Sequence, residues 1–95
     1  MRYYPVLLNL KNKKCVVIGG GIVALRKALS LLKAGARVYL ISPELCPGLK
    51  RLKEQKRIFW TNSAYQKIHL KGAFLTIAAT SDKAINTKIS QDAKK

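Results

Sequence analysis

The stretch Val17-Ile18-Gly19-Gly20-Gly21-Ile22-Val23-Ala24 decides the fold of this chain of 95 residues. It completes a short apolar run over 14–18 without polar alternation, which is typical of a strand covered on both faces. It opens an amphipathic helical pattern over 22–34. A glycine-rich turn between such a strand and such a helix predicts the first β-α unit of a parallel sheet. The apolar side of the helix is expected to carry Val23, Leu25, Ala28, Leu29, Leu31 and Leu32.

The glycines fit the spacing G-x-G-x-x-[GA], with Gly19, Gly21 and Ala24 in the three required places. The first small residue allows a sharp turn, the second lets a diphosphate approach the main chain, and the third lets helix and strand pack closely. Free N–H groups at the helix start then face the phosphates. The alternative is a glycine-rich turn without a ligand. The residues expected to bind the dinucleotide here are Gly19, Gly20, Gly21, Ile22, Val23 and Ala24.

A second strand is predicted over 37–41, and the loop after it supplies further candidates. In dinucleotide-binding proteins an acid about 20 residues beyond the glycines binds the adenosine ribose. This strand ends at Ser42-Pro43-Glu44, so the ribose would meet Glu44, or Ser42 in its place, from the loop. Lys50 and Arg51 follow and would tolerate a 2′-phosphate, so these residues leave NAD and NADP open. Glu44 as a plain acid at a helix start is the alternative.

The rest of the chain continues the alternation of strands and helices. The pattern predicts a short basic helix over 45–55 interrupted by Pro47-Gly48, strands over 57–60 and 73–79, and an irregular connection over 65–70. A last helix follows Thr80. This order predicts the α/β class, namely a Rossmann-type parallel sheet of strand order 3-2-1-4 in one domain over 1–95, ending after about four strands. The fourth strand would be an open edge that favours self-association.

The turn after the predicted fourth strand is expected beside the glycine loop. Ligands of open parallel sheets bind beyond the carboxyl ends of the strands, where the strand order reverses. Ala79 and Thr80 lie at that point, and their small side chains leave room for a nicotinamide ring. Ser81 or Asp82 is expected to cap the last helix. A functional carboxylate at Asp82 is the alternative.

The composition indicates a folded basic domain. There are 19 Lys and Arg residues against four acids, giving a formal net charge of +15, while 48% of the residues are apolar. That apolar fraction excludes a disordered basic tail. The charge favours a polyanionic partner, although the lysines are scattered and form no block typical of nucleic-acid binding. No apolar run reaches the roughly 18 residues of a membrane span, and no secretory signal is recognisable. We therefore expect a cytoplasmic protein that binds neither nucleic acid nor membrane.

Neither a metal site nor a catalytic group is visible. Cys15 and Cys46 form no C-x-x-C pair, and with the single His69 they cannot supply the four ligands of a structural zinc ion. The two cysteines are expected to be reduced thiols packed as small apolar groups, and a disulfide between them is the alternative. No serine or cysteine has a base nearby in sequence, so the catalytic residues are unknown. His69 is interpreted as a surface or half-buried residue rather than a catalyst.

These motifs together resemble the amino-terminal domain of the siroheme synthase family, whose members are precorrin-2 dehydrogenases and in part also sirohydrochlorin ferrochelatases. The resemblance covers essentially the whole chain. It is carried by Tyr4-Pro5-Val6, Leu8-Asn9-Leu10, Cys15 to Gly21, Val23-Ala24-Leu25-Arg26-Lys27, Leu32 to Ala36, Ile41-Ser42-Pro43-Glu44, and Ile77 to Asp82 with Asn86. It implies NAD-dependent oxidation of precorrin-2 to sirohydrochlorin in siroheme biosynthesis, with the cofactor at the glycine loop, Ile22-Val23 and Pro43-Glu44. A basic domain also suits a polycarboxylate tetrapyrrole substrate.

The chain departs from that family in two places. Ser81 stands where the family usually has the first of two aspartates. The family's next strand, with the carboxylate implicated in catalysis, and its dimerisation and substrate-binding region lie beyond these residues. The resemblance implies a homodimer for the full-length protein. From the 95 residues alone we expect dinucleotide binding without turnover.

Two other classes of function compete with this interpretation. One is a non-catalytic NAD(P)-sensing regulatory module built on the same β-α-β start, although such modules generally carry an acid at the tip of the second strand. The other is a basic nucleic-acid-binding domain, whose affinity would fall steeply with salt.

Overall fold

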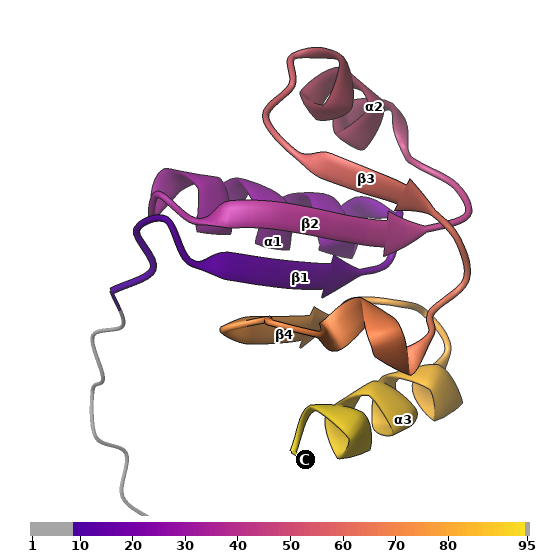
Figure 1. Cartoon of the computed structure of the whole chain (residues 1–95). Coiled ribbons are helices and arrows are strands. Elements are labelled where there is room, and N and C mark those ends of the chain that lie inside the picture. The colour runs from indigo at the N-terminus through magenta and orange to yellow at the C-terminus, as the bar shows by residue number, and fades with distance from the viewer. Residues whose placement is uncertain (1–8, 95) are drawn as a thin grey trace, which may run out of the picture.

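The computed structural model describes residues 9–94, so Tyr4-Pro5-Val6 and Leu8, which carry part of the family resemblance, lie outside the described residues. Strands and helices alternate along the chain (Figure 1). The elements are β1 (Lys14–Ile18), α1 (Ile22–Lys33), β2 (Arg37–Ser42), α2 (Pro47–Glu54), β3 (Phe59–Asn62), the 3₁₀ turn η1 (Lys67–Leu70), β4 (Leu75–Ala78) and α3 (Lys83–Ala93).

The four strands form one parallel sheet in the order β3-β2-β1-β4. This is the predicted order of a Rossmann-type sheet. The register places Ile18 of β1 beside both Ile41 of β2 and Ala78 of β4, so these strands reach the same edge. The order along the sheet reverses between β1 and β4, and the loops after both strands meet there. β4 is an outer strand among the described residues, as expected, and its self-association stays a prediction.

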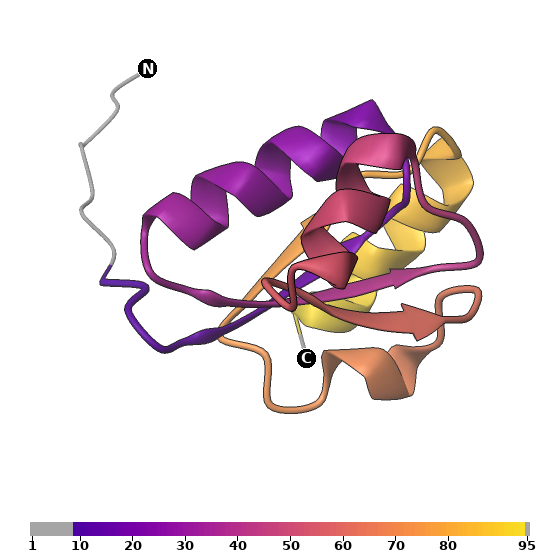
Figure 2. The same ribbon diagram turned by 90° about the horizontal axis from the view of Figure 1, so that it is seen from above.

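Helices lie on both faces of the sheet, as the view from above shows (Figure 2). α1 and α2 pack on one face over Cys15, Val17, Val38 and Leu40, which are buried. On the other face Ile89 of α3 packs against alternate residues of the same strands, among them Val16 and Ile18. Both faces of β1 and β2 are therefore covered, which explains why their sequences are continuously apolar.

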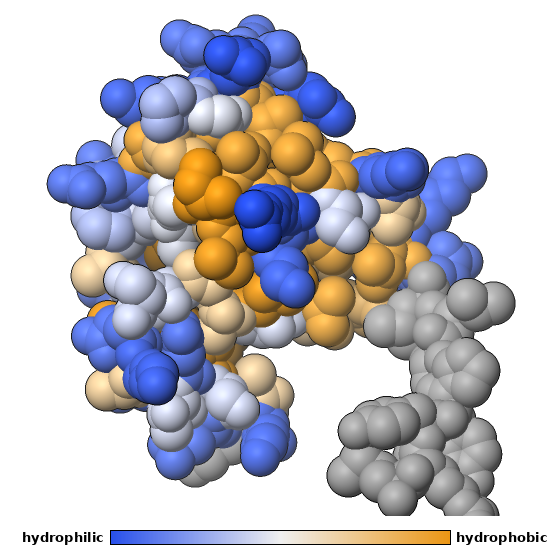
Figure 3. Space-filling view, turned by 180° about the vertical axis from the view of Figure 1, so that it is seen from behind, coloured by the Kyte–Doolittle hydropathy of each residue, from blue (hydrophilic) through white to orange (hydrophobic). Residues whose placement is uncertain are grey.

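Helix α1 buries a narrower stripe than its sequence predicts. Ala24, Ala28 and Leu31 are buried, and the predicted polar positions Arg26, Lys27, Ser30 and Lys33 are exposed. The prediction was wrong for Val23 and Leu29, which are 54% and 43% exposed. A helix lying on a single sheet covers only the residues that face that sheet. The view from behind shows apolar surface interrupted by hydrophilic side chains (Figure 3).

Helix α2 begins at Pro47, so the prediction that Pro47-Gly48 interrupts a helix from residue 45 was wrong. Proline suits the first turn of a helix because the N–H group it lacks has no partner there. The strand predicted over 57–60 instead spans Phe59–Asn62. Lys56 adopts a left-handed φ of 59°, and the Arg57 N–H donates to the Leu52 carbonyl, so these two residues still complete the end of α2.

The last strand and the last helix lie where the sequence predicts them, and the helix has the predicted cap. β4 lies within the predicted segment 73–79, and α3 follows the turn after Thr80. The Asp82 carboxylate caps α3 by accepting hydrogen bonds from the N–H groups of Ala84 and Ile85, at 2.9 and 3.2 Å. Within residues 9–94, none of the helices combines the length and apolarity that crossing a membrane requires.

Candidate functional site

A cleft of about 710 Å³ opens at the carboxyl edge of the sheet. This volume lies in the range of small-molecule and cofactor sites. Its walls come from the loops that follow the four strands and from the first turns of α1 and α3. The lining residues are Ile18, Gly19, Gly20, Gly21, Ile22, Val23, Ile41, Ser42, Pro43, Glu44, Leu45, Cys46, Ser63, Ala64, Tyr65, Ala79, Thr80, Ser81, Asp82 and Ile85.

The cleft brings together every residue that the sequence assigned to dinucleotide binding except Ala24. Ala24 is fully buried between α1 and the sheet. It therefore allows the close approach of helix and strand that the third place of the glycine motif requires.

Gly19 and Gly20 are glycines because the protein's own backbone leaves no room for a side chain. Gly19 has φ of +142°, which other residues rarely adopt, and a Cβ there would lie 2.5 Å from the Ala79 carbonyl oxygen. A Cβ on Gly20 would overlap the carbonyl group of Glu44. These two positions therefore let the loops after β2 and β4 close onto the turn after β1.

Gly21 differs, since a Cβ built on it meets no atom within 4 Å. Its φ of −101° and ψ of −162° are extended values that any residue adopts. Neither packing nor backbone conformation within the described chain therefore requires glycine here. The residue is the N-cap of α1 and makes no side-chain cap, so the first N–H groups of the helix face the open cleft.

The loop after β2 is held against the glycines. The Cys46 N–H donates to the Gly20 carbonyl at 2.7 Å, and the Ser42 hydroxyl donates to the Glu44 carbonyl at 2.6 Å. Ser42 is buried, whereas Pro43 and Glu44 are exposed in the cleft wall. The Ser42 side chain therefore holds the loop in shape, while the Glu44 carboxylate is available to a ligand.

The loop after β4 is fixed by a small polar network around Thr80. Its hydroxyl donates to the Asn86 side-chain oxygen at 2.6 Å, and the Asn86 amide donates back to the Thr80 carbonyl at 2.9 Å. The Asp82 N–H donates to the Thr80 hydroxyl at 3.2 Å. This network holds Ala79 and Thr80 beside Gly19.

Sequence reasoning missed the contribution of the segment over 63–65, which also lines the cleft. The signal lay in the topology: β3 and β4 are parallel outer strands on opposite sides, so their connection starts at the carboxyl edge and must cross the sheet. Within it the Tyr65 hydroxyl donates to the Asp92 carboxylate at 2.5 Å, tying the segment to α3. Burial, together with the hydrogen bond and the negative charge of Asp92, raises the pKa of Tyr65 to about 12. Leu45, Cys46 and Ile85 were missed as well.

Comparison with known families shows the family to which this chain belongs. The sequence profile of a family described as "Putative NAD(P)-binding" matches residues 6–95. This chain belongs to that NAD(P)-binding family. The match covers the glycine turn and all four loops that build the cleft.

Relatives of this NAD(P)-binding domain include two siroheme synthases. That of Photobacterium profundum is 44% identical over 93 residues, which are 98% of this chain and 20% of the relative. That of Nitrosospira multiformis is 43% identical over 99 residues, covering 100% of this chain and 21% of the relative. The chain therefore spans about a fifth of the length of these relatives.

A solved structure named "SirC, precorrin-2 dehydrogenase" is similar in fold to this NAD(P)-binding domain. It superimposes with a TM-score of 0.86 at 25% sequence identity. The alignment covers 93% of this chain and 44% of that one, and it supports the Rossmann-type interpretation of the sheet.

The charges around the cleft are unevenly placed. Among residues 9–94, its lining includes the acids Glu44 and Asp82 but neither lysine nor arginine. Phosphates would therefore meet main-chain N–H groups and the positive end of the α1 dipole rather than basic side chains. Lys50 and Lys53 of α2 line a separate cavity, which shares residues 43–45 with the cleft.

The two cysteines and the histidine lie in different environments. Cys15 is buried in the sheet, where burial raises the pKa of its thiol, and Cys46 lines the cleft as a second free thiol. The Nδ1 atom of His69 accepts the Gln66 N–H at 3.0 Å, outside the cleft lining. Over residues 9–94, no three His, Cys, Asp or Glu residues gather into a possible metal site.

Proposed function

We propose that the cleft binds NAD with its diphosphate at the glycine loop. The N–H groups at the start of α1 would hold the phosphate oxygens, beside the open space at Gly21. Glu44 would bind the adenosine ribose, and Ala79 and Thr80 would border the nicotinamide. Ile22 and Val23, which are 57% and 54% exposed at the cleft, would contact the cofactor with their apolar side chains.

The observation that carries this proposal is the contrast between Gly21 and its two neighbours. Gly19 and Gly20 are required by the fold, whereas the missing side chain at Gly21 only keeps space free in the cleft. That space lies at a helix start whose N–H groups carry no side-chain cap, which is the environment that suits a phosphate.

Amide NMR spectra recorded during titration with NAD+ test where the cofactor binds. We expect the largest shift changes at 19–23, at Glu44 and at Thr80. The amides of Lys13 and Phe74, at the amino ends of the strands, serve as the internal control and should not move. Shift changes concentrated at the control positions, or none at all, would reject the proposed site.

We further propose that the domain serves a precorrin-2 dehydrogenase, as the names of the similar proteins suggest. When bound, NAD+ supplies the oxidising power: it accepts a hydride from precorrin-2 while a proton leaves to water, giving sirohydrochlorin, NADH and H+. The residues of this chain would hold the cofactor, orient the nicotinamide toward Ala79 and Thr80, and exclude water from the apolar side of the cleft.

A chimera tests the dehydrogenase assignment. In it, these 95 residues replace the matching fifth of the Photobacterium siroheme synthase. We expect the chimera to convert precorrin-2 into sirohydrochlorin with formation of NADH, and the Gly21→Val chimera to lose this activity. A folded chimera that binds NAD+ but does not oxidise precorrin-2 would reject the dehydrogenase assignment while leaving cofactor binding intact.

The compartment and the assembly state belong to this proposal as well. Two free thiols, Cys15 and Cys46, suit the reducing cytoplasm. Homodimerisation of the full-length protein stays a prediction, which sedimentation of that protein would test.

A further inference from the structure

Basic residues that are scattered along the sequence gather at one edge of the folded domain. Parallel strands all begin at the same edge of a sheet, so the segments that lead into them meet there. The Arg37 Nε–H donates to the Asn12 carbonyl at 3.1 Å, which joins the segments before β2 and β1. The Lys14 ammonium donates to the Lys71 carbonyl at 2.8 Å, which joins those before β1 and β4. The bases in the segments that lead into the four strands are Lys11, Lys13, Lys14, Arg37, Lys56, Arg57 and Lys71.

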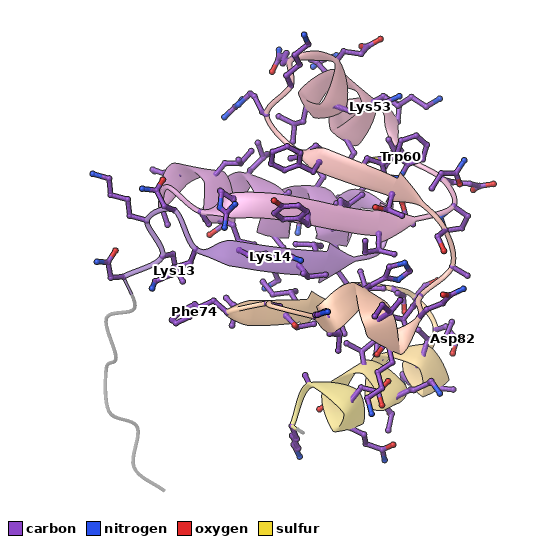
Figure 4. The ribbon with its side chains drawn as sticks, in the orientation of Figure 1. Lys13, Lys14, Lys53, Trp60, Phe74 and Asp82 are labelled. Atoms are coloured by element: carbon purple, nitrogen blue, oxygen red, sulfur yellow. The ribbon has the colours of Figure 1, made fainter. Side chains whose placement is uncertain are left out.

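The acids of the chain lie outside these segments. Glu44 and Asp82 line the cleft at the carboxyl edge, and Glu54 lines a second cavity of about 550 Å³ formed by α2, β3 and the loop after β2. The fourth acid, Asp92, lies in α3. In Figure 4 Lys13 lies at the end of the sheet opposite Asp82. The amino edge is therefore the basic pole of a chain with a net charge of +15, and its field attracts polyanions.

Exposed aromatic rings lie among these bases. The rings of Tyr39 and Phe59 stack at a centroid distance of 4.7 Å, and the Nζ atom of Lys14 lies 4.9 Å from the Tyr39 centroid. The Nζ atom of Lys13 lies 5.1 Å from the centroid of the Phe74 ring (Figure 4). Phe59 and Phe74 are 56% and 50% exposed. This sheet face is turned to the viewer in Figure 1, where the described helices leave β3 open.

Single-stranded nucleic acid offers both of the groups that suit such a surface. Its bases stack on exposed aromatic side chains, and its phosphates bind lysine and arginine. Aromatic side chains on a sheet face serve as the stacking platform of RNA-binding domains. A duplex keeps its bases stacked inside and would meet only the cations. An acidic protein surface would neutralise the cations without supplying bases to stack on the rings.

We propose that the amino-edge surface, which consists of Lys13, Lys14, Tyr39, Phe59 and Phe74, binds single-stranded nucleic acid. Bases would stack on the two phenylalanine rings, and the surrounding bases of the protein would bind the phosphates. RNA and single-stranded DNA share this chemistry. The surface uses no residue of the cleft, so the inference holds whether or not the cleft binds NAD. The expectation from the sequence that the domain binds no nucleic acid is set aside, because the fold brings together lysines that form no block along the chain.

Fluorescence anisotropy with labelled oligouridine and oligothymidine of about 15 nucleotides tests the inference on the 95-residue chain. Phe59→Leu and Phe74→Leu keep an apolar side chain but remove the ring. Lys13→Gln removes one charge from the amino-edge surface. Lys27→Gln is its matched control, because it removes the same charge from an exposed position on α1. Circular dichroism shows that each variant is folded.

We expect the wild type to bind a single strand, with a Kd that rises at least about tenfold between about 50 and 200 mM salt. Each leucine variant should weaken binding at least about fivefold, since stacking on a ring is lost. Lys13→Gln should weaken it more than Lys27→Gln. The strand that binds more tightly identifies RNA or DNA as the ligand, and either one supports the inference.

Three results would overturn the inference. The first is the absence of binding to both single strands. The second is wild-type affinity in folded Phe59→Leu and Phe74→Leu, or equal losses in Lys13→Gln and Lys27→Gln, because either shows only a diffuse attraction of charge. The third is equal affinity for a duplex of the same length or for polyglutamate, which would assign the surface to polyanions without free bases.

Discussion

The main-chain N–H of Cys46 donates to the carbonyl oxygen of Gly20 at 2.7 Å. This bond joins the loop after β2 to the glycine turn after β1, two segments that are far apart in sequence. It requires the two backbones to approach so closely that Gly20 faces the Glu44 carbonyl without space for a methyl group. The walls of the cleft are thus held by backbone contacts that glycine alone permits.

Replacing Gly20 with alanine is therefore expected to destabilise the fold. The new methyl group would overlap a backbone carbonyl, and overpacking of this kind costs roughly 1–3 kcal/mol. Gly21→Ala, which meets open space, should cost less than about 1 kcal/mol. Urea unfolding, monitored by circular dichroism, measures the loss of stability in each variant. Equal losses in the two variants would contradict the difference between these glycines.

Asp82 is expected to stabilise α3 through its two hydrogen bonds to the first turn. Asp82→Ala should lower the free energy of unfolding by about 1 kcal/mol. Asp82→Asn should lower it much less, because the amide oxygen of asparagine still accepts hydrogen bonds from the first turn of the helix. Ser81→Ala is the control and should have little effect. An unchanged unfolding midpoint in Asp82→Ala would show that the cap is unimportant in solution.

The hydrogen bond between Tyr65 and Asp92 predicts that the Tyr65 phenol titrates at unusually high pH. Because the pKa of Tyr65 is raised to about 12 from 10.0, the neutral phenol stabilises the folded state below pH 10, and this contribution is lost as the pH rises through about 12. Difference absorbance between the wild type and Tyr65→Phe should show tyrosinate forming near pH 12. In Asp92→Asn the transition should move to lower pH. A Tyr65 titration near pH 10 in the wild type would contradict the pair.

Cys46 and Cys15 should react differently with thiol reagents. Cys46 lines the cleft and is half-buried, whereas Cys15 has no exposed surface and its pKa is raised by burial. A thiol reagent should modify Cys46 first, and NAD+ should slow that reaction by occupying the cleft. Cys46→Ser identifies the reacting thiol. Modification of Cys46 at the same rate with and without saturating NAD+ would place the cofactor elsewhere.

The sequence predicted those features that depend on neighbouring residues. The β-branched run of β1, the glycine turn and the cap at Asp82 are local patterns, and all three lie where they were expected. The strand order followed from the α/β alternation. The boundaries of α2 and β3 were less accurate because Pro47 and Lys56 act through backbone conformation at the helix ends.

The missed parts of the site depend on contacts between distant segments. Tyr65 reaches the cleft only because its segment crosses the sheet edge, and its partner Asp92 lies on the last helix. Lys53 and Trp60 meet because α2 and β3 fold back on each other. The periodicity of the sequence does not indicate which distant residues will be in contact. The second cavity could therefore be recognised only in the structure.

The most direct test of the central claim is calorimetric NAD+ binding to the wild-type chain and to Gly21→Val. The valine side chain would enter the space that we assign to the diphosphate, and its Cβ would meet no atom of the described chain within 4 Å. Ser30→Val, an exposed position on the same helix outside the cleft, is the matched control. We predict that Gly21→Val keeps its circular dichroism spectrum and weakens NAD+ binding at least about tenfold, or about 1.4 kcal/mol. Unchanged affinity in a folded Gly21→Val chain would contradict the claim.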